Sequence, residues 1–221
     1  FGFSTHSNMD QCLSDAARLG WIDGIMTSYN YRLMNADAMK RAVDACVKAG
    51  IGLTAMKTQA TFFSYFYADI GKENDMAMEL TDRFIKKGFT PEQAKLKAVL
   101  DNPNIASICS EMPSMTILRA NVAAVLDQTP LSSQDKRFLD RYARKTAGGY
   151  CAGCARLCEP ALNGRVPVSD VMRYLMYHDL YGDHAQAVRL FHEIPANTRR
   201  RLTRINFSGA EALCPQKMPI G

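Results

Sequence analysis

Four cysteines in the last third of the chain have the residue type and spacing to bind a metal. Cys151, Cys154 and Cys158 lie in the segment YCAGCARLCEP, and Cys214 comes directly before Pro215 in LCPQKMPIG. Thiolates are soft ligands, and a short loop carrying three of them, completed by a remote Cys-Pro, is typical of iron–sulfur proteins. The pattern therefore predicts an iron–sulfur cluster that carries electrons.

Two other interpretations of these thiols stay open. A four-cysteine zinc site uses the same ligands but usually takes them as two Cys-x2-Cys pairs, whereas here three cysteines share one segment. Disulfides suit small secreted domains that are short of core, but this chain has 221 residues, 47% hydrophobic residues and an odd number of cysteines, seven.

The spacing also differs from that of bacterial ferredoxins, whose pattern is Cys-x2-Cys-x2-Cys-x3-Cys-Pro. Leu157 stands where the third cysteine of that pattern would fall, and no second triplet is present. We therefore expect one cluster, of the [4Fe–4S] type. The other three cysteines, Cys12, Cys46 and Cys109, fall in apolar patterns and are expected to be buried free thiols, because cysteine packs as a small hydrophobe.

Composition narrows the classes of partner. No apolar run approaches the roughly 18 residues that a transmembrane helix needs, so no membrane span is expected. The formal charge is +5, and the dense basic run at Arg199, Arg200, Arg201 and Arg204 is interpreted as a solvated helix face rather than a nucleic-acid site. Contact with phosphate or with an acidic redox partner protein is the alternative for these arginines.

The first residues, FGFSTHS, have no initiator methionine and no signal peptide, so the sequence is interpreted as a fragment. The cytoplasm is the default expectation for its location, and any export signal would lie upstream. As half of a closed barrel, the fragment would expose two sheet edges, which predicts aggregation when it is expressed alone.

Apolar runs alternate with helical patterns through the first 126 residues. The expected strands are Phe1 to Ser4, Ile22 to Ser28, Ile51 to Met56 and Ile105 to Cys109. The expected helices are Asn8 to Leu19, Ala36 to Ala49, Asp75 to Lys87, Pro91 to Leu100 and Met115 to Leu126. This alternation predicts an α/β fold with a parallel sheet. No glycine-rich nucleotide motif follows a strand, which favours half of a (β/α)8 TIM barrel over a doubly wound sheet.

From about Ser132 the pattern is helical only. We therefore expect two domains, a half-barrel at residues 1–130 and a small α-helical iron–sulfur domain at 131–221. Three helical stretches lie between Cys158 and Cys214, and this region is expected to loosen without its metal, because metal binding contributes folding free energy.

Several segments, in this order, resemble the C-terminal half of an aldo/keto reductase. The resemblance is to the branch that carries a C-terminal ferredoxin-like [4Fe–4S] domain. The matching segments are GFSTH, SYN, GIGLTAMKTQ, IASICSEMPSMTILRANVAAV, the cysteine triplet and CPQ with the following PIG. The resemblance implies that the four strands are strands five to eight of the barrel. It also implies hydride transfer between NADP or NAD and a small carbonyl substrate.

The catalytic aspartate, tyrosine, lysine and histidine of that family lie on the first four strands. No catalytic residue is therefore assigned here, and the fragment alone is expected to be inactive. By resemblance, the cofactor-binding residues are Ser4, Thr5, Met56, Lys57, Ser114 and Asn121. Ser4 and Thr5 would hold the nicotinamide carboxamide, Met56 and Lys57 the nicotinamide and pyrophosphate, and Ser114 and Asn121 the adenosine.

The chain departs from the family at several cofactor contacts. Thr5 replaces an asparagine, Met26 a glutamine, Glu111 a glycine and Ile117 an arginine. The departures at Glu111 and Ile117 leave the choice between NADP and NAD open. Those at Met26, Glu111 and Ile117 favour an alternative function, in which a reductase-like barrel without carbonyl chemistry acts as an iron–sulfur electron relay or binding module. Ser4, Lys57 and Asn121 favour the reductase. Each of three residues also has a purely structural interpretation that involves no cofactor. Lys57 would be a surface lysine, Ser114 a helix cap and Tyr29 a packing residue with a hydroxyl partner.

Overall fold

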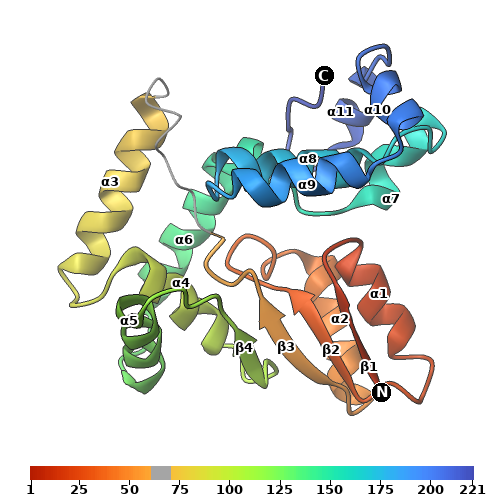
Figure 1. Cartoon of the computed structure of the whole chain (residues 1–221). Helices are drawn as coiled ribbons and strands as arrows, with labels where there is room; N and C mark the ends of the chain where they lie inside the picture. The colour runs from red at the N-terminus through yellow and green to blue at the C-terminus, as the bar shows by residue number, and fades with distance from the viewer. Residues whose placement is uncertain (61–70) are drawn as a thin grey trace. The chain divides into compact units, whose positions relative to one another are not determined.

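The chain alternates strands and helices up to residue 126 and continues in helices alone (Figure 1). The structure, a computed structural model, describes residues 1–60 and 71–221; the aromatic stretch at 61–70 lies outside the described residues. Among the described residues the chain divides into two compact units, unit 1 (1–60 and 71–144) and unit 2 (145–221). No helix in these ranges is both long and apolar enough to cross a membrane.

Unit 1 is an α/β unit built on four strands. Its elements are β1 (Gly2–Thr5), α1 (Met9–Ala16), β2 (Gly24–Ser28), α2 (Asp37–Lys48), β3 (Gly52–Met56), α3 (Gly71–Ile85), α4 (Pro91–Leu100), β4 (Ser107–Cys109), α5 (Met115–Leu126) and α6 (Ser133–Lys145). The four expected strands and the parallel sheet are confirmed, and α5 has the expected bounds.

The sheet is parallel throughout, and its strands follow one another in the order β1-β2-β3-β4. Thr5 pairs with Thr27, Ser28 with Met56, and Met56 with Cys109, so the carboxyl ends of all four strands meet at one edge. This sequential order lacks the reversal point of a doubly wound sheet.

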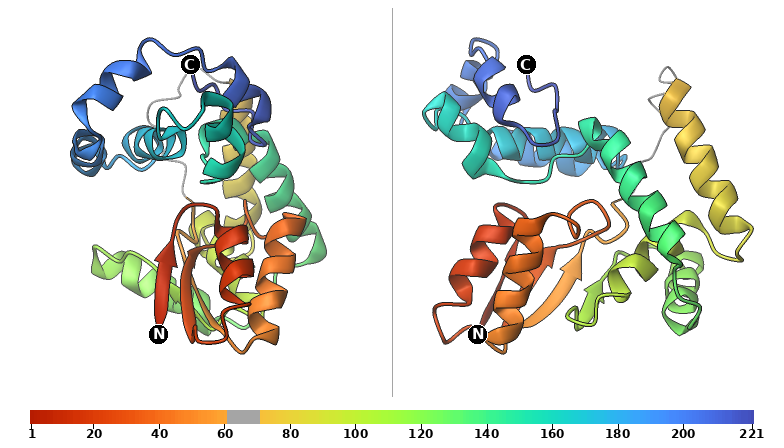
Figure 2. Two further views of the ribbon diagram at one scale, coloured as in Figure 1. Left: turned by 90° about the vertical axis from the view of Figure 1, so that its right-hand side faces the viewer. Right: turned by 180° about the vertical axis from the view of Figure 1, so that it is seen from behind.

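Helices α1 and α2 pack side by side against one face of the sheet (Figure 2). Their buried residues include Leu13 and Cys46, and the Cys46 thiol donates to the Leu13 carbonyl oxygen at 3.4 Å. Cys46 is therefore buried and free, as expected. The expectation was wrong for Cys109, which is free but exposed, because β4 is short and pairs with β3 on one side only among the described strands.

Two local features hold the remaining helices of unit 1. Thr90 caps α4: its hydroxyl accepts the Gln93 N–H at 3.2 Å, and the Gln93 side chain accepts the Thr90 N–H at 2.8 Å. Helix α6 is joined to α3 through Asp135, which accepts from Arg83 at 2.8 Å and Lys87 at 2.5 Å. Because of such contacts α6 belongs almost entirely to unit 1, so the observed division falls after residue 144 rather than after 130.

Unit 2 is wholly helical. Its elements are the 3-10 helices η1 (Ala147–Gly149) and η2 (Glu159–Leu162), and the α-helices α7 (Ala155–Cys158), α8 (Val168–Asp179), α9 (His184–Glu193), α10 (Ala196–Leu202) and α11 (Ser208–Leu213). Helices α8 and α9 lie side by side (Figure 1). A separate core forms around η2, the start of α8 and α11, and it includes Leu162, Val166 and Ala210 together with Cys158 and Cys214.

Candidate functional site

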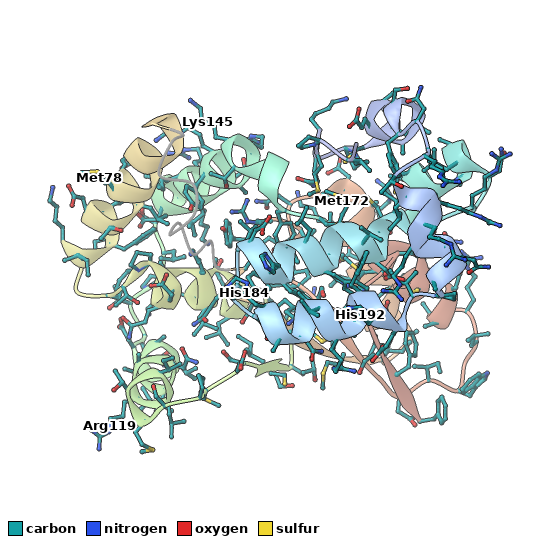
Figure 3. The ribbon with its side chains drawn as sticks, turned by 45° about the horizontal axis from the view of Figure 1, so that its top comes forward. Met78, Arg119, Lys145, Met172, His184 and His192 are labelled. Atoms are coloured by element: carbon teal, nitrogen blue, oxygen red, sulfur yellow. The ribbon has the colours of Figure 1, made fainter. Side chains whose placement is uncertain are left out.

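The four cysteines of the predicted cluster line a single pocket in unit 2. The residues around this cysteine pocket are Cys151, Ala152, Cys154, Cys158, Val168, Ser169, Met172, Cys214, Pro215, Gln216, Met218 and Ile220. All four cysteines are free thiols. Met172, which marks the α8 wall of the pocket, is labelled in Figure 3. The fold therefore brings two distant segments of the chain together at their cysteines.

The triplet segment is shaped by a tight turn between Cys151 and Cys154. Gly153 has φ of +73°, a backbone conformation that residues with a Cβ rarely adopt. Burial raises the pKa of the Cys151 thiol, and a hydrogen bond from the Gly153 backbone acts against that rise. The turn places Cys154 just before the short helix α7, which ends at Cys158.

Replacing Gly153 by alanine is expected to destabilise this turn by roughly 1–2 kcal/mol, because a Cβ at positive φ is strained. The thermal unfolding temperature of unit 2 should fall. Gly148→Ala is the matched control: it lies in η1, has no positive φ, and a Cβ there would meet nothing within 4 Å. Equal unfolding temperatures for the two variants would contradict the role given to the turn.

Cys214 reaches the pocket from the end of α11. Its N–H donates to the Glu211 carbonyl oxygen at 3.1 Å, and its own carbonyl accepts from Lys217 at 3.1 Å. The Glu211 side chain accepts the N–H groups of Ile220 at 2.8 Å and Gly221 at 2.9 Å, which lower the pKa of this carboxyl group. The segment after Cys214 is thus folded back onto α11, and Met218 and Ile220 join the pocket wall.

Burial and the neighbouring groups raise the pKa of three of these thiols, Cys151, Cys154 and Cys158. Burial raises the pKa of Cys154 to about 12, and the nearby Cys151, Cys158 and Cys214 add to that rise. Burial also raises the pKa of Cys158 to about 11, with Glu159 and Cys151 contributing. A bound cation reverses this balance, because metal coordination deprotonates a thiol outright.

The residues present fit a cluster in two respects. Four soft ligands converge on a pocket whose remaining lining is mostly apolar, and the buried hydroxyl of Ser169 has no hydrogen-bond partner in the part of the chain that the structure describes. As these side chains stand, no three His, Cys, Asp or Glu residues in the described ranges form a site for a single metal ion.

In unit 1 the structure places four of the expected cofactor residues at the carboxyl edge of the sheet. Ser4 and Thr5 end β1, and Met56 ends β3 with Lys57 directly after it. The Thr5 hydroxyl already has a hydrogen-bond partner within the chain, because it donates to the Ser7 carbonyl oxygen at 2.7 Å. Lys57 has φ of +55° and is half-buried, and its carbonyl accepts the Asn30 side-chain N–H at 3.0 Å.

The other two expected cofactor residues serve the fold directly. The Ser114 hydroxyl caps α5 by accepting the Ile117 N–H at 3.3 Å, which matches the structural interpretation of this residue as a helix cap. Asn121 is buried and bridges two loops: it accepts from the Gln59 side chain at 3.1 Å and donates to the Ser110 hydroxyl at 3.2 Å. These bonds occupy its amide groups within the chain.

Two polar side chains near the strand ends also have partners. His6 Nδ1 and the Ser28 hydroxyl are 2.7 Å apart and connect the ends of β1 and β2. Tyr29 is buried, and its hydroxyl accepts from the Asn102 side chain at 2.7 Å, as expected of a packing residue with a hydroxyl partner. Burial raises the pKa of Tyr29, and the bond to Asn102 acts in the opposite direction.

Sequence reasoning missed Lys95, the most deeply buried lysine among the described residues, with a side chain 3% exposed. It stands 3.7 Å from Glu92 and over the Tyr31 ring at 5.9 Å. Burial lowers the pKa of Lys95 to about 8. The nearby Glu92 acts to raise this pKa, and the nearby Arg32 acts to lower it further. Nothing in the segment PEQAKLKAVL marks this lysine, since alternating lysines on a helix are ordinarily solvated.

Comparison with solved structures gives two partial similarities. One is to a thermostable aldo-keto reductase in complex with the inhibitor epalrestat, with 21% identity and a TM-score of 0.37 over 54% of this chain and 39% of that one. The other is to an aldo-keto reductase from Bacillus halodurans in its holo form, with 18% identity and a TM-score of 0.48 over 64% of this chain and 49% of that one. The chain thus spans less than half of each. No protein-family model matches it, and no curated protein matches it.

Proposed function

We propose that unit 2 binds one [4Fe–4S] cluster through Cys151, Cys154, Cys158 and Cys214. The observation that carries this proposal is the convergence of all four cysteines, from two distant segments, on one pocket. When bound, such a cluster supplies one-electron transfer. The chain's own part is to provide four thiolates and to exclude water with the apolar wall of the pocket.

The arrangement also bears on the choice between a cluster and zinc. A single tetrahedral zinc ion with Zn–S bonds of about 2.3 Å draws its four sulfurs to within about 3.8 Å of one another. A cluster places several iron and sulfide ions between the same ligands, so its cysteines stand further apart. Among the described residues no three of these thiols are placed to hold a single ion, which accords with the wider arrangement.

The test is reconstitution of the full chain with iron and sulfide under anaerobic conditions. We expect a broad visible absorbance band and about four irons per chain in the starting protein. Cys154→Ala should abolish the band, because a short loop cannot supply another thiolate at that place. Cys109→Ser is the matched control, since Cys109 is free and exposed in unit 1, and it should load normally. One zinc ion per chain and no iron in the reconstituted protein would contradict the proposal.

For unit 1 we propose a reductase-type role on half of a (β/α)8 barrel, in which Ser4, Thr5, Met56 and Lys57 face NADP or NAD at the carboxyl edge of the sheet. The sequential strand order supports this, because active sites of such barrels form at that edge. Ser114 and Asn121 would reach the adenosine only by giving up their present hydrogen bonds. The substrate class is a small carbonyl compound.

The alternative is that unit 1 performs no hydride chemistry and the chain relays electrons through unit 2 to a redox partner protein. The internal hydrogen bonds of Asn121 and Thr5 favour it. Titration with NADPH and NADH, followed by protein fluorescence, separates the two. Saturable binding that Lys57→Met weakens supports the reductase role, and no binding at millimolar nucleotide supports the relay.

A further inference from the structure

Ser169 lies in the first turn of α8 and lines the cysteine pocket. It is 3% exposed. Its main-chain groups are satisfied: the N–H donates to Glu159 Oε1 at 3.0 Å, and the carbonyl oxygen accepts from the Cys151 thiol at 3.7 Å. Its hydroxyl is buried and meets hydrogen-bond geometry with no group in the described residues, but it lies near the Cys151 thiol and acts against the rise in that thiol's pKa that burial causes.

A buried hydroxyl without a partner costs free energy, and such groups in native proteins call for an explanation. A hydroxyl donates one hydrogen bond, so the missing partner is an acceptor. The pocket beside Ser169 is lined by four cysteines, whose sulfurs become acceptors once they are thiolates. The same turn places the amino end of a twelve-residue helix at the pocket, and that end favours negative charge.

We infer that the Ser169 hydroxyl donates a hydrogen bond to a sulfur of the bound group, a cysteine thiolate or a cluster sulfide, and thereby sets its reduction potential. This inference rests on the proposed function. Hydrogen bonds to the sulfurs are one of the means by which a protein tunes an iron–sulfur centre. The bond is stronger when the centre holds one more electron, so it stabilises the reduced state and raises the potential. Ser169 is a positioning residue and not a ligand.

The test is a redox titration of the reconstituted full chain with dithionite, followed by the electron paramagnetic resonance signal of the reduced state. Ser169→Ala should shift the one-electron equilibrium toward the oxidised state by about fivefold to tenfold, a lower midpoint by up to 59 mV. Ser169→Thr keeps the hydroxyl and should stay near the starting value. Ser208→Ala makes the same change at an exposed serine in the first turn of α11, outside the pocket, and should also leave the midpoint unchanged.

The outcomes separate this inference from the proposal beneath it. Equal iron content with equal midpoints in the starting protein and Ser169→Ala overturns the role of Ser169 alone. Absence of iron and sulfide from the starting protein overturns the proposed function and this inference with it. If Ser169→Ala fails to load, loading of Ser169→Thr at the starting midpoint supports the hydroxyl, and failure of both variants overturns it. In the iron-free chain Ser169→Ala should unfold no more easily, because it removes an unpaired buried group.

Discussion

Replacing Asp135 by alanine is expected to lower the free energy of unfolding of unit 1 by about 3 kcal/mol. The side chain is 1% exposed and accepts hydrogen bonds from Arg83 at 2.8 Å, Lys87 at 2.5 Å and the Ser132 hydroxyl at 2.6 Å. Its removal leaves two cations without their shared partner and α6 without its first-turn contact. Urea unfolding followed by circular dichroism measures the loss.

Acid should produce the same effect in the unaltered chain. Burial opposes ionisation of Asp135, but the bonds from Lys87, Ser132 and Arg83 prevail and lower its pKa to about 2. A carboxyl group with a lowered folded-state pKa stabilises the fold above about pH 4, and that contribution is lost as the pH falls toward 2. The difference between the starting protein and Asp135→Ala should therefore shrink over this range.

Glu79→Ala is the control for Asp135. Glu79 pairs with Arg141 at 2.9 Å and so joins the same two helices, α3 and α6, but both side chains are about half exposed. An exposed pair of this kind contributes roughly 0–1 kcal/mol. Similar losses for Asp135→Ala and Glu79→Ala would show that burial of Asp135 adds nothing to its pairing.

Replacing Lys95 by methionine is expected to stabilise unit 1 at pH 7 by up to about 3 kcal/mol. At that pH the buried lysine is charged in both the folded and the unfolded chain, and burial of its charge costs free energy. Because its folded-state pKa, about 8, lies below the usual 10.5, the starting protein gains stability as the pH rises from about 8 to above 10. The advantage of the methionine variant should fade over that window, as urea unfolding at a series of pH values would show.

Lys97→Met is the matched control on the same helix, and the opposite sign is expected. Lys97 is also buried, but its ammonium group donates to the carbonyl oxygens of Asp127 at 2.6 Å and Thr129 at 3.0 Å. Its loss leaves these groups unpaired and should destabilise unit 1 by roughly 1–3 kcal/mol. Stabilisation by both changes, or by neither, would contradict the distinction between the two lysines.

The features that could be predicted well from the sequence are those determined by residues close together in the chain. Apolar runs predicted the four strands, the helix expected from Pro91 to Leu100 matches α4, and the cysteine spacing identified a group that the fold brings together. Lys95 and Asp135 could not be found this way, because their burial comes from elements far along the chain. Asn121 shows the same limit: it lies on α5 while its partner Gln59 lies after β3, and no pattern in the sequence connects the two.

The placement of Cys158 and Cys214 in one core has a consequence for the unfolded chain. A bound group that holds both cysteines closes the chain between them into a loop, which carries α8, α9, α10 and α11. By the entropy model used for disulfides, closing a loop of this length lowers the conformational entropy of the unfolded chain and so raises its free energy by about 4 kcal/mol. Under the proposed function, the bound cluster acts as a reversible cross-link, and the iron-free chain is expected to be cut more readily by proteases between these cysteines.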